Sequence, residues 1–209
     1  MSEVLRIALT KGRLEKNTVE LFEKMGYDCT ELHEKGRKLI LPIKEKNIEV
    51  VLAKAADVIT YVEHGVCALG IVGKDTILEM NPKIFEMLDL GFGKCKFALA
   101  TKKDKDFYAG YGVKVIATKY PNVSRKFFES KGMDIEIVKI EGSVELAPLL
   151  ELSDAIVDIV ETGNTLKANG LEVIEDVVPI SARLIVNKVS LKMKKKRVEE
   201  LIHDIKENI

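Results

Sequence analysis

The feature that most constrains the fold is an alternation of two apolar patterns along the chain. Short apolar runs typical of buried strands are followed by segments whose apolar residues recur at the helical period, and this happens in two successive blocks. In the first block we predict strands at 5–9, 39–43, 48–53 and 67–72, with helices at 14–25, 56–64 and 75–80. In the second we predict strands at 96–101, 113–118, 135–140, 155–160, 171–180 and 184–186, with helices at 121–131 and 144–150 and a C-terminal helix. Such alternation favours an α/β fold with mostly parallel sheets flanked by helices.

Length and charge narrow the possible functions. The chain has 209 residues, with 33 Lys plus Arg against 33 Asp plus Glu. This length fits one domain or two small lobes, and the zero net charge argues against a basic field that would attract nucleic acid. The longest stretch without Lys, Arg, Asp, Glu or His, residues 65–73, is far shorter than the roughly 20 residues needed to cross a bilayer. We therefore expect neither a nucleic-acid partner nor a membrane span.

The N-terminal segment and the cysteines predict a cytoplasmic location. The N-terminal residues lead directly into a strand-like segment, without the basic and apolar regions of a signal peptide. Cys29, Cys67 and Cys95 are odd in number and widely spaced, which fits reduced, buried thiols better than disulfides.

The strongest chemical motif is the segment 154–166, in which an apolar strand ends in Thr162-Gly163-Asn164-Thr165 before a helical turn. Backbone N–H groups and two hydroxyls at such a helix start form a cradle for phosphate. A simple Asn/Gly turn with a capping Thr has the same pattern. Asp158 favours the functional interpretation, because a carboxylate inside an apolar strand is costly unless it has a polar task, such as binding sugar hydroxyls.

Basic or glycine-containing turns follow, or precede, several predicted strands. Lys11-Gly12-Arg13 ends the first strand, and an arginine there can grip a phosphate through two parallel donors. The turn 35–38, which contains Arg37, and the turn 73–75 are further candidates, although a solvated surface turn explains each one taken alone. The turn 73–75 lacks the Walker pattern, and the histidines and cysteines lack metal-ligand spacing.

Taken together, these segments resemble the short form of the ATP phosphoribosyltransferase family from residue 5 to about 191. The matching segments are 9–13, 37–40, 57–58, 61–65, 73–75, 117–123, 142–148, 154–166, 169–171 and 183–187. Their order along most of the chain makes the resemblance specific. It implies two lobes like those of a type II periplasmic binding protein, which we place at 1–90 plus 190–209 (lobe I) and at 91–189 (lobe II, with the loop 154–166).

The resemblance also implies a reaction and its participants. The phosphoribosyl group of PRPP is transferred to N1 of ATP, giving N1-(5-phosphoribosyl)-ATP and pyrophosphate, the first step of histidine biosynthesis. Mg²⁺ is the implied cofactor, carried by the pyrophosphate of PRPP without assigned protein ligands. Short-form relatives work with a regulatory subunit resembling histidyl-tRNA synthetase, so we expect a homodimer that assembles with such a partner into a hetero-oligomer.

Site residues are carried over from the matching motifs. The residues implied to bind PRPP are Glu145, Asp154, Asp158, Glu161, Thr162, Gly163, Asn164 and Thr165. Those implied to bind ATP are Lys11, Gly12, Arg13, Lys54, Gly73 and Asp75, although Lys54 stands where relatives often have Arg. Arg13 and Arg37 match basic positions near ATP and the pyrophosphate, and we assign them the catalytic role.

A second class of function stays open at this point. A non-catalytic ligand-binding or sensor module has the same two-lobed fold, and a fold does not determine a function. The lack of a signal peptide argues against a transport receptor, and the basic turns with a phosphate loop argue against a sensor of small amino acids.

Overall fold

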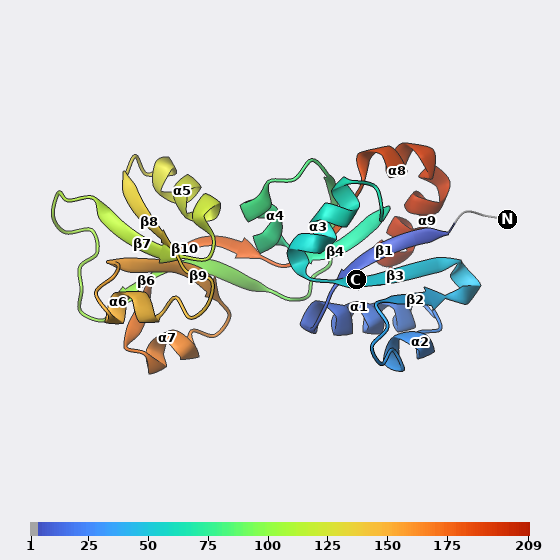
Figure 1. Ribbon diagram of the computed structural model, residues 1–209, viewed down its shortest axis with the longest axis horizontal. Coiled ribbons are helices and arrows are strands. Elements are labelled where there is room, and N and C mark those ends of the chain that lie inside the picture. The colour runs from blue at the N-terminus through green and yellow to red at the C-terminus, as the bar shows by residue number, and fades with distance from the viewer. Residues whose placement is uncertain (1–3) are drawn as a thin grey trace. The chain divides into compact units, whose positions relative to one another are not determined.

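The computed structural model describes residues 4–209, which form two compact units (Figure 1). Unit 1 comprises the described residues up to Gly93 together with Ser181–Ile209, and unit 2 is Lys94–Ile180. The sequence-based division assigns residues 182–186 to the second lobe. In the structure this segment, β11 (Ala182–Val186), pairs with a strand of unit 1 instead.

Unit 1 is built on a six-stranded sheet in the order β2-β3-β1-β4-β11-β5. Besides β11, its strands are β1 (Leu5–Thr10), β2 (Ile40–Ile43), β3 (Ile48–Ala53), β4 (Leu69–Gly73) and β5 (Phe85–Asp89). β1 runs parallel to both β3 and β4, whereas the remaining neighbours are antiparallel. The predicted hairpin is confirmed: β2 and β3 pair antiparallel and are joined by the 3-10 turn Lys44–Lys46.

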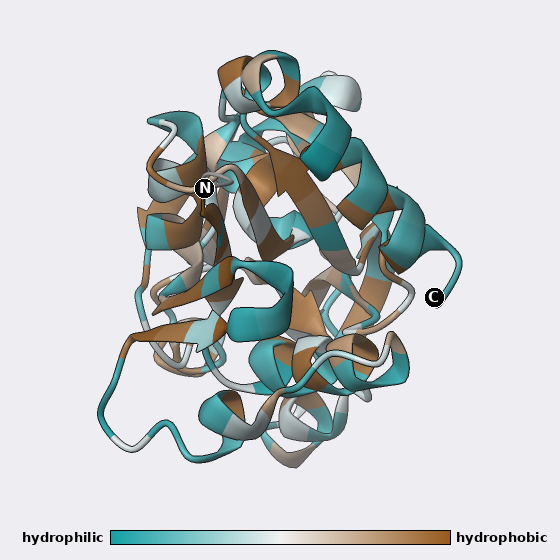
Figure 2. Cartoon of the chain, turned by 90° about the vertical axis from the view of Figure 1, so that its right-hand side faces the viewer, coloured by the Kyte–Doolittle hydropathy of each residue, from teal (hydrophilic) through white to brown (hydrophobic). Residues whose placement is uncertain are grey.

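Helices cover both faces of this sheet. α1 (Arg13–Lys24), α2 (Thr30–His33) and α9 (Lys195–Lys206) contribute Phe22, Leu32 and Val198, all buried, to the core on one face. α3 (Ala55–Glu63) and α4 (Lys74–Met80) pack Val58 and Ile77 on the other. α8 (Lys188–Met193) leads into α9. Figure 2 shows the resulting pattern, with hydrophobic residues concentrated on the strands and hydrophilic residues on the outer faces of the helices.

Unit 2 has a five-stranded sheet in the order β10-β6-β9-β7-β8. Its strands are β6 (Cys95–Lys102), β7 (Lys114–Thr118), β8 (Ile135–Lys139), β9 (Ala155–Val160) and β10 (Leu171–Ile180). α6 (Leu146–Leu149) and α7 (Asn164–Ala168) pack Ala147 and Leu166 against one face. α5 (Pro121–Ser130) buries Phe128, whose ring centroid lies 6.0 Å from that of Phe107.

The α/β class is confirmed, but the sheets are mixed rather than mostly parallel. β7 is parallel to β8 and β9, while β6 is antiparallel to both β9 and β10. The reason lies in the chain path. β6 carries the chain into unit 2 and β10 carries it out, so the two run in opposite directions, and β5 and β11 of unit 1 are antiparallel for the same reason. The sequence analysis missed β5.

None of the helices in residues 4–209 is long and apolar enough to span a membrane.

Candidate functional site

The first cluster of candidate residues lies at one edge of the unit 1 sheet. Because β3, β1 and β4 are parallel neighbours, the turns that follow them emerge at the same edge. These turns contain the predicted groups at 11–13, at 54 and at 73–75. The structure therefore brings together three segments that the sequence separates by about 60 residues, and we call this the carboxyl edge of unit 1.

The turn between β1 and α1 has a backbone that favours glycine. Gly12 has φ 96° and ψ −130°, a region that other residues rarely adopt. Lys11 donates its backbone N–H to the carbonyl of Ala53 at 2.9 Å, which ties the turn to the end of β3. Lys11, Gly12 and Arg13 are exposed. Two cationic side chains thus project from a turn whose backbone is fixed.

Arg37 reaches the same edge by a different route. β2 is antiparallel to β3, so the residues before β2 lie beside the carboxyl end of β3. Leu39 accepts a hydrogen bond from the N–H of Leu52 at 2.8 Å and continues the ladder to this edge. Arg37 precedes it by two residues and is exposed, as is Lys54 at the start of α3.

In the turn between β4 and α4, the side chain of Asp75 contacts residues of the same turn. A Cβ atom on Gly73 would lie 2.0 Å from Oδ1 of Asp75, so the close approach of this carboxylate requires glycine at position 73. Oδ2 of Asp75 accepts a hydrogen bond from the hydroxyl of Thr76 at 3.3 Å. The carboxylate of Asp75 is therefore turned back toward Gly73 and Thr76 of its own turn.

The second cluster follows β9 in unit 2. β9 ends at Val160, Gly163 adopts the left-handed conformation (φ 75°, ψ 5°), and α7 begins at Asn164. The hydroxyl of Thr162 accepts from the N–H of Asn164 at 3.4 Å. Glu161, Thr162, Asn164 and Thr165 are exposed. A pocket of about 290 Å³ borders this loop and is lined in part by Lys96 and Lys167, which supply positive charge.

Asp158 lies on β9 just before this loop. Asp158 is two residues from both Ile156 and Val160, so the three side chains share one face of the strand. That face is covered by α6 and α7. Burial, assisted by the negative charge of Glu145, raises the pKa of Asp158 to about 6. Glu145 stands at the start of α6. The structure therefore brings Asp158 and Glu145 close to each other, at the same end of β9 as the loop.

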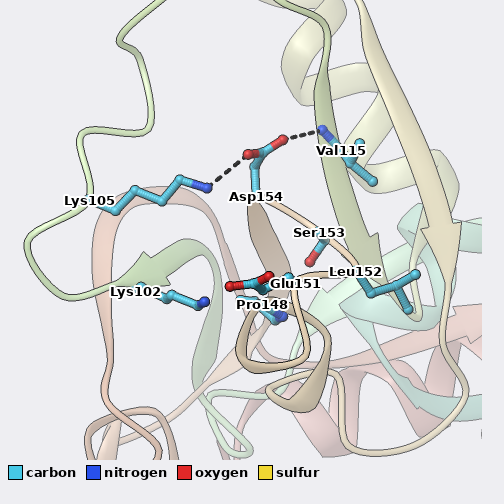
Figure 3. A pocket seen from close by; sticks show the side chains of 8 residues that line it. All are labelled: Lys102, Lys105, Val115, Pro148, Glu151, Leu152, Ser153 and Asp154. Atoms are coloured by element: carbon cyan, nitrogen blue, oxygen red, sulfur yellow. Dashed lines mark hydrogen bonds and ion pairs between the residues drawn. The ribbon is translucent and has the colours of Figure 1, made fainter.

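Asp154 is not part of this cluster, contrary to the sequence-based expectation that it lies near the loop. It precedes β9, at the opposite end of the strand. Its carboxylate is 2.8 Å from the ammonium of Lys105 and accepts from the N–H of Val115 at 2.9 Å (Figure 3). Burial alone would raise the pKa of Asp154, but these two hydrogen bonds together with the positive charges of Lys105 and Lys114 outweigh burial and lower it. Asp154 lines a separate pocket of about 420 Å³ with Lys102 and Ser153.

One residue near the carboxyl edge, Glu15, was missed by the sequence analysis, whereas its partner Lys35 lies in the candidate turn 35–38. Glu15 is buried and accepts hydrogen bonds from the N–H of Gly12 and from the ammonium of Lys35. Glu15 stands three residues after Gly12, where an acidic side chain can accept the N–H of the N-cap residue, but glycine lacks the side chain that completes a capping-box signal, and nothing local pairs Glu15 with Lys35.

The described residues offer no cluster of metal ligands, and the thiols of Cys29 and Cys67 are held in the protonated form. Within residues 4–209 no set of three His, Cys, Asp or Glu side chains is arranged to hold a metal ion. Cys29 and Cys67 are buried thiols, and burial raises the pKa of both to about 11.

Comparison with known proteins identifies the family. Residues 54–207 match the family model described as HisG: ATP phosphoribosyltransferase. The chain is 60% identical to an ATP phosphoribosyltransferase of Clostridium kluyveri over 98% of this chain and 94% of that protein. It is 58% identical to one of Clostridium acetobutylicum over 98% and 95%.

Solved structures agree with this match. A chain of the ATP phosphoribosyl transferase (HisG:HisZ) complex from Thermotoga maritima superposes with a TM-score of 0.83 and 34% identity, covering 98% of both chains. The periplasmic aliphatic sulphonate binding protein SsuA of Escherichia coli superposes with a TM-score of 0.62 at 12% identity, covering 100% of this chain and 73% of that one, and shows the fold alone. On the family model and the curated relatives together, this chain belongs to the ATP phosphoribosyltransferase family.

Proposed function

We propose that this chain carries out the ATP phosphoribosyltransferase reaction with its two clusters in separate roles. The reaction moves the phosphoribosyl group of PRPP to N1 of ATP and releases pyrophosphate, as the first step of histidine biosynthesis. The loop Glu161–Thr165 with Asp158 and Glu145 holds the ribose 5-phosphate of PRPP. The carboxyl edge of unit 1 binds ATP and the departing pyrophosphate. The observation that carries this assignment is that Asp158 lies at the same end of β9 as an exposed loop with left-handed Gly163.

The chemistry of the loop supports its role in binding the phosphorylated sugar. N–H groups at the start of a helical turn and the hydroxyls of Thr162 and Thr165 suit the 5-phosphate. The carboxylate of Asp158 accepts hydrogen bonds from the ribose hydroxyls. Because these hydrogen bonds favour the charged form of the carboxylate, PRPP offsets the cost of its burial.

Catalysis depends on charges that are already in place. Breaking the bond between C1 of the ribose and the pyrophosphate oxygen leaves positive charge on the sugar and extra negative charge on the pyrophosphate. Arg13 and Arg37 stabilise that negative charge more strongly in the transition state than in the ground state. N1 of adenine is a weak nucleophile, so its positioning matters more than a general base.

We treat Mg²⁺ as part of the substrate, delivered as the magnesium complex of PRPP. The carboxyl edge of unit 1 presents ammonium and guanidinium groups, which bind phosphate oxygens rather than a cation. The metal would neutralise part of the charge on the pyrophosphate. We assign it no protein ligand.

We also propose a partner and a location. The Thermotoga maritima structure is a HisG:HisZ complex, and we propose that this chain forms a homodimer that assembles with a corresponding regulatory subunit resembling histidyl-tRNA synthetase. The thiols of Cys29 and Cys67 need no oxidising compartment, which supports a cytoplasmic location.

The test is direct formation of product. The purified chain, alone and with the regulatory subunit, is mixed with ATP, PRPP and Mg²⁺, and phosphoribosyl-ATP is followed by its absorbance and by mass spectrometry. Product should form in at least one of the two samples and should be absent when PRPP is omitted. Binding of both ligands without product in either sample would instead support the non-catalytic ligand-binding module.

A further inference from the structure

Glu15 is a buried carboxylate whose two partners come from different segments. It belongs to the first turn of α1, and only 6% of its surface is exposed. One carboxylate oxygen accepts the backbone N–H of Gly12 at 3.2 Å. The other accepts a hydrogen bond from the ammonium of Lys35, which lies in the turn before β2.

These contacts join the two turns that carry the proposed catalytic arginines. Gly12 directly precedes Arg13, and Lys35 precedes Arg37 by two residues. The turn that contains Arg37 is itself closed by a hydrogen bond from the N–H of Lys38 to the carbonyl of Lys35 at 2.9 Å. Fixing Lys35 therefore restrains the backbone on both sides of Arg37.

Capping of α1 explains only one of the two contacts. The bond from Gly12 to Glu15 is the acidic half of a capping box, which stabilises the start of a helix. The contact with Lys35 adds nothing to that cap. It does balance the charge of a carboxylate that would otherwise be buried unpaired, and it does so with a cation from the second arginine-bearing turn.

We propose that Glu15 is a positioning residue for phosphoribosyl transfer, because it sets the spacing between the turn of Arg13 and the turn of Arg37. This inference rests on the proposed function, which gives both arginines the departing pyrophosphate as their target. Groups that stabilise developing charge must be in place before the reaction. A displacement of about 1 Å can lower a rate by about 100-fold.

The test compares variants that break the contact from either side. Glu15→Gln keeps an acceptor for Gly12 but loses the charge, and Lys35→Met keeps the carboxylate but removes its partner. Each should lower kcat about 10- to 100-fold, with little change in the dissociation constant for PRPP. Lys35→Arg should retain most of the activity because it retains the cation. The double variant should be little worse than either single variant, because all three lose one shared interaction.

The matched control is Glu49→Gln. Glu49 also forms an ion pair in unit 1, with Arg6 at 2.8 Å, but at positions where β1 and β3 begin rather than at the carboxyl edge. This variant should keep the kcat of the wild-type chain. Thermal unfolding and circular dichroism of every variant measure the folded fraction, so that kcat is expressed per folded molecule.

Different results overturn different claims. If the wild-type chain forms no product with or without its partner, the proposed function itself fails. If the wild-type chain is active and Glu15→Gln or Lys35→Met matches it per folded molecule, the positioning role is wrong while the function stands. Additive losses in the double variant would likewise refute the proposed coupling between Glu15 and Lys35.

Discussion

At the scale of single residues, the environment of Asp158 makes a ligand affinity depend on pH. Its pKa is raised to about 6, mainly by burial, so the charged form that accepts hydrogen bonds from ribose predominates only above that pH. We expect PRPP affinity to rise between pH 5 and 7 beyond the change caused by titration of PRPP itself. Asp158→Asn should bind PRPP more weakly and lack this additional rise, as calorimetry at several pH values would show. Equal affinity and an equal pH profile in the two proteins would remove Asp158 from the sugar site.

The same carboxylate also affects the stability of the unliganded chain. Because the folded pKa is higher than the unfolded value of 3.8, the folded state binds more protons between about pH 4 and 6, and stability falls as the pH rises through this range. The loss is absent below the unfolded pKa and complete above pH 6. Asp158→Asn should therefore raise the free energy of unfolding by about 1–3 kcal/mol at pH 7.5 and change it little near pH 3.5. Urea unfolding at both pH values tests this, and a gain of the same size at both would contradict it.

Arg13 should act on the transition state more than on ATP binding. Arg13→Ala is expected to lower kcat about 10²- to 10³-fold with a smaller rise in KM for ATP. The reason is that the negative charge that the guanidinium stabilises develops fully on the pyrophosphate only as it departs. Steady-state kinetics with ATP varied at saturating PRPP separates the two constants. A rise in KM at unchanged kcat would show that Arg13 only binds ATP.

At the scale of elements, the turn between β1 and α1 depends on the backbone of Gly12. A side chain at this position would meet no atom within 4 Å, so the cost of substitution is conformational rather than steric. Gly12→Ala should lower the free energy of unfolding by about 1–3 kcal/mol and reduce activity, because it displaces Arg13. Gly142→Ala, at a glycine with open space and no positive φ, is the matched control and should be close to wild type in stability. Equal unfolding midpoints for the two variants would show that the turn is not strained.

The junction between β11 and α8 is held by Asn187. Its side-chain oxygen accepts from the N–H groups of Val189 and Ser190 at 2.9 and 2.8 Å, and its amide donates to the carbonyl of Val62 at 2.8 Å. Asn187→Ala should cost about 1–3 kcal/mol, since it removes a helix cap and leaves a buried carbonyl without this donor. Asn187→Ser keeps a capping acceptor and should be less destabilising. Thermal unfolding ranks the variants, and a smaller loss for Ala than for Ser would contradict this role.

At the scale of the whole molecule, the path of the chain makes unit 2 a candidate for independent folding. Its first strand, β6, and its last strand, β10, pair antiparallel, so that Cys95 at the start of β6 lies opposite Ile180 at the end of β10. Excision of residues 94–180 therefore leaves the five-stranded sheet intact. We expect this fragment to unfold cooperatively and to bind PRPP more weakly than the full chain does. Circular dichroism and calorimetry test both points, with Asp158→Asn in the fragment as the control for binding. A fragment without a cooperative transition would show that unit 2 depends on unit 1.

What the sequence by itself determined is local. Most strands and the longer helices were predicted from apolar periodicity, because that pattern records which face of each segment is buried; the short α2 and the largely exposed β5 were not. The loop Glu161–Thr165 and the turn Lys11–Arg13 were recognisable because their residues are contiguous, and the order of the motifs was enough to identify the family.

Only the tertiary structure decided how distant segments meet. The mixed direction of the sheets and the place of β11 in unit 1 follow from strand pairing. The contact between Glu15 and Lys35, which joins the turns of Arg13 and Arg37, spans 20 residues and two elements. Periodicity cannot encode such pairings, because it specifies that a face is buried and leaves open which segment covers it; that choice is made by packing of the whole unit.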